Sequence, residues 1–116
     1  MWVITKAAIT MVVRNARSQT LYVASKLINC KSPHVVEVLA LSWASKYAED
    51  CEWKNIICAS DAAEVVKEVH NVAEPQGWDT CYELIEIRWR FSLMNWYLVW
   101  NPRETIKLLI WLLVCL

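Results

Sequence analysis

The segment NIICASDAAEVVKEVHNV (residues 55–72) decides the fold class of this 116-residue chain. Residues 55–59 end in an unbroken apolar run of strand length, which is typical of a parallel strand covered on both faces. From Ala62 onward, alanine and valine recur at the spacing of one apolar helix face. The segment therefore predicts a strand that leads directly into a helix, with Asp61 at the joint. In open α/β sheets, the carboxyl ends of the strands form the edge where ligands and catalytic groups collect.

Asp61 itself has two interpretations. With Glu64 three residues later it forms a capping-box-like pair, and such a cap stabilises a helix by about 1 kcal/mol through the amides of the first turn. The same carboxylate is also a candidate metal ligand at the sheet edge. The local pattern alone favours the cap, because strand-to-helix joints commonly end with such a residue.

A second acid stands in a helix predicted from Pro33 to about Asp50, since Ser32 followed by Pro33 is a good helix start. Glu37 falls on the apolar side of this helix, where a lone carboxylate is costly to bury unless it is paired or bound to a metal. Alternatively, Glu37 lies in the first turn, reaches solvent and interacts favourably with the positive helix end. The opposite, polar side collects Ser42, Ser45, Lys46 and Glu49.

The composition limits the classes of function. A chain of 116 residues with 57% apolar content predicts one globular domain, residues 1–116, that can bury a core. The formal net charge of zero gives no general attraction to nucleic acid, so such binding requires a local basic patch. The five cysteines include no C-x-x-C pair, which indicates reduced thiols in an intracellular protein rather than a disulfide framework or a zinc site.

Neither a membrane span nor a secretory signal is predicted. The first residues, MWVITKAAITMVV, have a lysine in their middle and no clean cleavage region. The last nine residues, LLIWLLVCL, are too short to cross a bilayer, which needs about 20. A single glycine is unusual for a domain, because turns normally use glycine where φ is positive.

The other elements follow from local patterns. They are short strands at residues 2–5, 11–15 and 20–24, loops at 29–33 and 74–77, a helix at 80–92 capped by Thr80 with Glu83, a strand at 95–100 and a turn at 101–104. A final helix is predicted at residues 106–116. Because it is apolar almost all round, we expect it to be buried or to pair with a partner chain.

Some basic and aromatic residues are candidates for nucleic-acid contact. Arg88 and Arg90 lie on late turns of the helix at residues 80–92 and could contact phosphate, although arginines near a helix end are more often solvated or compensate the helix dipole. Trp96 and Trp100 could stack on bases, but the eight tryptophans of so small a domain are mostly expected in the core.

Four stretches together resemble the ribonuclease H-like domain of plant reverse-transcriptase-like and retroelement-derived proteins. They are SPHVVEVLALSWA (residues 32–44), NIICASDAAEVVKEV (residues 55–69), YELIEI (residues 82–87) and NPRE (residues 101–104). The resemblance spans residues 32–116, with a weaker match at residues 2–5. It implies an α/β fold with a mixed sheet flanked by helices, in which N-terminal strands are missing or degraded.

The resemblance also implies a chemistry. In that family four carboxylates hold two Mg²⁺ ions that activate a water and stabilise the leaving oxygen when the RNA strand of an RNA–DNA hybrid is cut. The family's helix glutamate corresponds to Glu37 and its strand-end aspartate to Asp61, so these two are the candidate catalytic residues and metal ligands. Arg88, Arg90 and Arg103 are the candidate contacts to nucleic acid, with Lys46 and Lys54 as further cations.

The sequence departs from the family at several of its functional positions. The first strand of the family carries an Asp-Gly pair, and residues 2–5 contain none. The family's last helix opens with H-x-P-R-E-x-N and has an aspartate four residues later, where this chain has Trp100, Ile106 and Ile110. With two of the four carboxylates absent, we expect hydrolysis to be weak or lost. The alternative is a non-catalytic remnant that binds nucleic acid or another protein.

Overall fold

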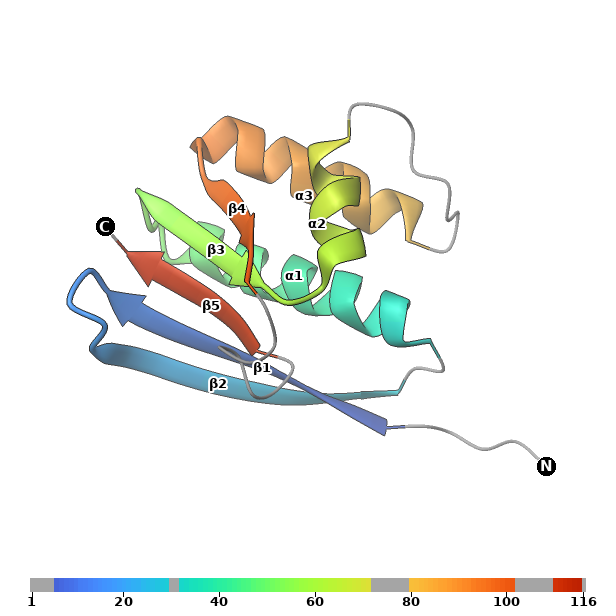
Figure 1. Cartoon of the computed structure of the whole chain (residues 1–116), viewed down its shortest axis with the longest axis horizontal. Coiled ribbons are helices and arrows are strands. Elements are labelled where there is room, and N and C mark those ends of the chain that lie inside the picture. Colours follow the sequence, from blue (N-terminus) through green and yellow to red (C-terminus); the bar gives the residue numbers. More distant parts are fainter. Residues whose placement is uncertain (1–5, 30–31, 72–79, 102–109, 116) are drawn as a thin grey trace.

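The computed structural model describes residues 6–29, 32–71, 80–101 and 110–115, which form three helices and one five-stranded sheet (Figure 1). The elements are β1 (Lys6–Asn15), β2 (Thr20–Asn29), α1 (Pro33–Asp50), β3 (Ile56–Ser60), α2 (Ala63–His70), α3 (Cys81–Met94), β4 (Tyr97–Trp100) and β5 (Ile110–Cys115). The strand order is β2-β1-β5-β3-β4, with both parallel and antiparallel pairs. The predicted α/β class, a mixed sheet flanked by helices, is thus confirmed.

The first two strands form a long antiparallel hairpin. Strand β1 is continuous from Lys6, so the predicted break between residues 5 and 11 is wrong for its described part. The turn is closed by the side chain of Asn15, whose Oδ1 accepts hydrogen bonds from the backbone N–H groups of Arg17 (2.9 Å) and Gln19 (3.0 Å). Ser18 takes the positive φ of 62° that glycine would otherwise supply in this turn.

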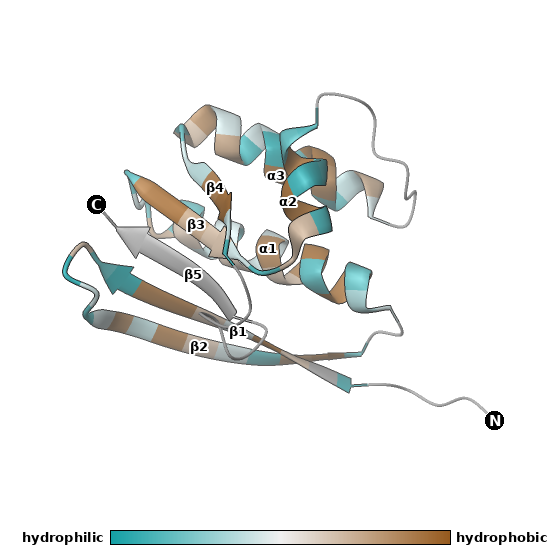
Figure 2. Cartoon of the chain, viewed as in Figure 1, coloured by the Kyte–Doolittle hydropathy of each residue, from teal (hydrophilic) through white to brown (hydrophobic). Residues whose placement is uncertain are grey.

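The hydrophobic core lies between the three helices and one face of the sheet. Alternate strand residues enter it, because successive side chains of a strand point to opposite faces. They are Ile9, Met11 and Val13 of β1, Ile56 and Cys58 of β3, and Leu98 of β4. Figure 2 shows hydrophobic residues along β1 and β3, and both hydrophobic and hydrophilic residues on the three helices. Tyr97 and Val99 point to the other face of β4 and are exposed.

The predicted C-terminal helix is wrong over residues 110–115, which form β5 in the centre of the sheet. Strand β5 is parallel to β1, where Val13 pairs with Leu113, and antiparallel to β3, where Cys58 pairs with the same Leu113. A central strand reads as a continuous apolar run, as does a fully buried helix, so periodicity cannot distinguish the two. Because both edges of β5 are already paired, the expected docking of a partner chain on a C-terminal helix does not apply to these residues.

Strand β2 extends to Asn29, whereas the predicted strand ends at residue 24. The other described elements lie close to their predicted bounds, and α1 matches the prediction from Pro33 to Asp50. Ser32 and Thr80 occupy the N-cap positions of α1 and α3, but neither cap is closed by a side-chain hydrogen bond. No described helix is long and apolar enough to cross a membrane. The predicted strand at residues 2–5, the loop at 74–77 and the turn at 101–104, apart from Asn101, lie outside the described residues.

Candidate nucleic-acid and metal site

Asp61 follows the last residue of β3, as the sequence predicts, and starts the connection to α2. The capping interpretation is not confirmed, because Ala62, and not Asp61, occupies the N-cap position of α2. The backbone N–H of Ala62 instead donates to the hydroxyl oxygen of the buried Ser60, at 3.0 Å. Asp61 is partly exposed at this edge of the sheet.

Strand β4 holds this joint in place. It is parallel to β3, with Ser60 opposite Trp100, so the two strands end side by side (Figure 1). Beyond the last pair, the backbone N–H of Asn101 donates to the carbonyl oxygen of Ser60 at 2.8 Å. The indole N–H of Trp100 donates to the carbonyl oxygen of Asp61 at 3.2 Å. Two hydrogen bonds, one from the last residue of β4 and one from the residue after it, therefore fix the backbone that carries the candidate acid.

Glu37 lies near the amino end of α1 and is partly buried. The first turn of α1 contains no acidic residue, so the interpretation of Glu37 as a first-turn acid is wrong. One turn earlier, His34 Nε2 lies 3.1 Å from Glu68 Oε1 on α2. This contact places the beginning of α1 beside the helix that directly follows Asp61, so both candidate acids belong to elements that meet α2.

A pair of Mg²⁺ ions does not fit the described side chains. Within residues 6–29, 32–71, 80–101 and 110–115, no group of three or more His, Cys, Asp or Glu side chains is placed to hold a metal ion. Two-metal sites hold their ions about 3.5–4 Å apart and need several oxygen ligands for each ion. One Mg²⁺ ion, in contrast, is commonly bound by one or two carboxylates together with water and substrate phosphates. The described side chains therefore provide no site for a pair of ions.

Arg90 does not have the surface position expected of a residue that contacts phosphate. Arg90 is only 6% exposed and lies between α3 and α1, where its Nη1 donates to Ser45 Oγ at 2.8 Å. Its Nε lies 3.6 Å from Glu49 Oε2. Ser45, predicted on the polar side of α1, is correspondingly buried. A guanidinium held inside a helix pair cannot reach a phosphate group on the surface, so the structure argues against Arg90 as a nucleic-acid contact.

Arg88 is directed toward the carboxyl-terminal half of α2. Its Nε and Nη2 both donate to the backbone carbonyl oxygen of Glu68, with an Nε distance of 3.0 Å. Lys54 is exposed and precedes β3, whereas Asp61 follows it, so the two residues lie at opposite ends of a strand about 15 Å long. Lys46 is exposed near the carboxyl end of α1, and Arg103 lies outside the described residues.

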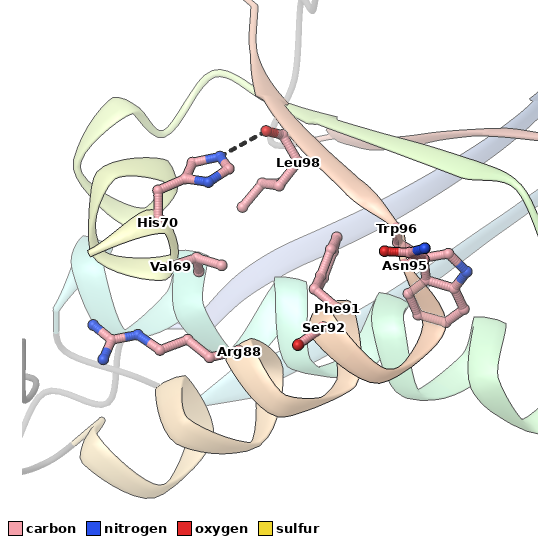
Figure 3. A pocket seen from close by; sticks show the side chains of 8 residues that line it. All are labelled: Val69, His70, Arg88, Phe91, Ser92, Asn95, Trp96 and Leu98. Carbon is pink, nitrogen blue, oxygen red and sulfur yellow. Dashed lines mark hydrogen bonds between the residues drawn. The ribbon is translucent and has the colours of Figure 1, made fainter. Parts of the chain in front are cut away.

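A separate pocket of about 280 Å³ opens between α2, α3 and β4. Figure 3 shows His70 and Leu98 on one side of it and Asn95 and Trp96 at one end, with Arg88 at the opposite end. His70 Nε2 donates to the carbonyl oxygen of Leu98 at 2.8 Å, which connects the end of α2 to β4. Since Asp61 lies before α2 and His70 ends it, this pocket is not part of the Asp61 site.

Trp96, just before β4, and Trp100, the last residue of β4, have different environments. Trp96 is 6% exposed and packs edge-on against Phe91, which confirms the expectation of a core residue. Trp100 is 51% exposed, so the expectation that it is buried is wrong. The tertiary structure distinguishes them, because Trp100 is the last residue of β4 and lies beside the polar Ser60–Asp61 joint.

Comparison with known proteins assigns the chain to a family. The reverse transcriptase-like family matches residues 3–112, which include the N-terminal hairpin as well as the stretches that carry the resemblance in sequence. Searches of curated proteins and of solved structures gave no match. The family match covers nearly the whole chain and agrees with the mixed sheet flanked by helices. The chain therefore belongs to the reverse transcriptase-like family, whose domain is ribonuclease H-like.

Proposed function

We propose that this chain is a nucleic-acid-binding domain in which Glu37 and Asp61 bind one Mg²⁺ ion, and that its hydrolysis of RNA in RNA–DNA hybrids is weak or absent. The family match supports nucleic acid as the ligand. The position of Asp61 at the carboxyl end of β3, beside the end of β4, carries the proposal, because ligands of open α/β sheets bind at this edge.

The metal has a limited role in this proposal. When bound, a Mg²⁺ ion would neutralise phosphate charge and so help the domain to hold the backbone of a nucleic acid. The carboxylates of Glu37 and Asp61 would hold it, with water and phosphate oxygens completing its octahedral shell. Weak hydrolysis follows from the absence of a third acid among the described residues that could hold a second ion.

The test measures binding of the whole chain to a fluorescently labelled RNA–DNA hybrid, with Mg²⁺ or with EDTA, together with cleavage of the same hybrid. We expect affinity to fall with increasing salt, as it does for contacts to phosphate. We also expect Mg²⁺ to raise the affinity of the natural chain and to have little effect on Glu37→Gln or Asp61→Asn.

Two exposed acids near the carboxyl end of α1 supply matched controls. Glu52→Gln and Asp50→Asn remove the same charges from positions remote from the Asp61 edge, and both variants should keep the Mg²⁺ response. Absence of binding at low salt would overturn the proposed function. An equal Mg²⁺ response in all four variants and the natural chain would reject Glu37 and Asp61 as ligands. Cleavage that survives in both site variants would exclude them from catalysis.

A further inference from the structure

Trp100 is the exposed aromatic residue that the described structure joins to a candidate metal ligand. Its indole N–H donates to the carbonyl oxygen of Asp61 at 3.2 Å, so its one hydrogen-bond donor is used within the protein. Half of the side chain nevertheless stays exposed, at 51%. What the ring offers a ligand is therefore apolar and π surface, which recognises planar groups by stacking and not by hydrogen bonds.

The ring is held by a rigid support. Trp100 pairs with Ser60 in the parallel β3–β4 ladder, and the following residue, Asn101, donates its backbone N–H to the Ser60 carbonyl oxygen at 2.8 Å. Together with the hydrogen bond from the indole to Asp61, these contacts restrain both the backbone of Trp100 and the edge of its ring. A side chain that is already ordered loses little conformational entropy when a ligand binds, so its contact contributes more to affinity.

The other aromatic residues that the structure describes as exposed lack this combination of features. Trp89 and Tyr82 are exposed on α3, and Tyr97 is exposed on the outer face of β4. Trp100 instead lies at the end of its strand, beside the residue whose carboxylate is the candidate ligand for Mg²⁺. The two features together match a nucleotide. The planar ring would contact the base, and the proposed Mg²⁺ ion would contact the phosphate.

We propose that Trp100 stacks on an unpaired nucleobase whose phosphate lies at the Asp61 site. The inference rests on the proposed function and adds to it the class of nucleic acid. Bases inside a continuous duplex already stack on both neighbours, so an indole can cover a base only at a single-stranded segment or at an end. The preferred ligand is thus a strand with unpaired bases, and the stack is tolerant of sequence because every base has a π face.

The experiment compares two single-stranded oligonucleotides of equal length and charge, one with a base at every position and one with abasic sites through its central part. Stacking on one base changes affinity by about 1–3 kcal/mol, so we expect the natural chain to bind the first about 5- to 150-fold more tightly. Trp100→Ala should lose most of this preference, and Trp100→Phe, which keeps a ring but not the indole donor, should keep part of it. Trp89→Ala is the control, because it removes an equally exposed indole from α3 and should leave the preference unchanged.

The outcomes separate the inference from the proposed function. If the natural chain binds neither oligonucleotide nor the RNA–DNA hybrid at low salt, both fail. If it binds them but does not distinguish the abasic strand, or if Trp100→Ala retains the full preference, the stacking assignment is wrong and the proposed function stands. The abasic comparison uses the natural chain, so the inference stays testable even when Trp100→Ala fails to fold.

Discussion

The imidazole of His34 lies 3.1 Å from the carboxylate of Glu68, measured between Nε2 and Oε1, and thereby connects the beginning of α1 to α2. The backbone carbonyl of the same Glu68 accepts two donors from Arg88 of α3. One residue of α2 thus contacts both other helices, one through its side chain and one through its main chain. The contacts hold α2, which begins two residues after Asp61, against both α1 and α3.

Removing the side-chain contact should have a small effect. Both partners are about one-third exposed, and ion pairs of that kind contribute less than about 1 kcal/mol. We expect Glu68→Gln to lower the free energy of unfolding by that amount or less in urea denaturation. We expect Arg88→Met to lower the free energy of unfolding by more, about 1–3 kcal/mol. This change removes the charged donors that bind the backbone carbonyl of Glu68, whereas Glu68→Gln leaves that interaction in place. The reverse order of the two effects would contradict this account.

Arg90 should be a determinant of stability and not of nucleic-acid affinity. Its guanidinium is buried and donates to Ser45, and its stem packs between two helices. We expect Arg90→Met, which keeps the volume, to lower the free energy of unfolding by about 1–2 kcal/mol, and Arg90→Ala to lower it further through lost packing. At a temperature where Arg90→Met remains folded, its affinity for nucleic acid should equal that of the natural chain. If folded Arg90→Met bound nucleic acid more weakly than the natural chain, the guanidinium would have to lie at the surface.

The cysteines should differ sharply in reactivity. Cys58 is fully buried, and this burial raises the pKa of its thiol, so it carries less of the reactive thiolate at any given pH. Cys51 is exposed. In variants that keep one cysteine each, we expect a maleimide at pH 7.5 to label Cys51 rapidly, and to label Cys58 only as fast as the protein opens. Rapid labelling of Cys58 in the folded protein would show that β3 is not covered as described.

Tyr47 should make the protein sensitive to alkali. The ring of Tyr47 stacks on that of Tyr22 with centroids 5.2 Å apart, and hydrogen bonding to Tyr22 is the main cause that raises the pKa of Tyr47 to about 12. A raised pKa means that the folded state favours the protonated phenol. The stability that this provides is complete below the unfolded-state pKa of about 10 and is lost as pH rises toward 12. Urea denaturation at pH 9 to 12 should show this loss, and it should be smaller in Tyr22→Phe.

Strand β5 should be required for cooperative folding. Leu113 pairs with Val13 of β1 and with Cys58 of β3, so β5 alone joins the β1–β2 hairpin to the β3–β4 pair within the described sheet. Proline lacks the N–H that a ladder needs and is excluded from central strands. We expect Leu113→Pro to abolish cooperative thermal unfolding, whereas Leu113→Ala, which keeps the backbone amide, should retain it with a lower Tm. A cooperative transition in Leu113→Pro would indicate that the centre of the sheet is filled differently.

Local patterns in the sequence determined much of the architecture. The bounds of α1 were predictable, as was a strand at residues 55–59, which the structure places at 56–60 with Asp61 after it. A proline-led helix start and a short apolar run are signals contained within a few neighbouring residues. The family resemblance, carried by residues 32–104, was likewise readable from the sequence and agrees with the match over residues 3–112.

Only the tertiary structure decided the role of residues 110–115, of Arg90 and of Trp100. An apolar run becomes a central strand only if two other strands offer free edges, and here those edges come from β1 and β3, far apart in the chain. Arg90 is buried because Ser45, 45 residues away, accepts a hydrogen bond from its guanidinium, and Trp100 is exposed because its strand ends where the sheet does. Periodicity records which residues are apolar or polar along one element. It contains no information on which distant element supplies the partner, and that partner determines whether a side chain is buried or free to meet a ligand.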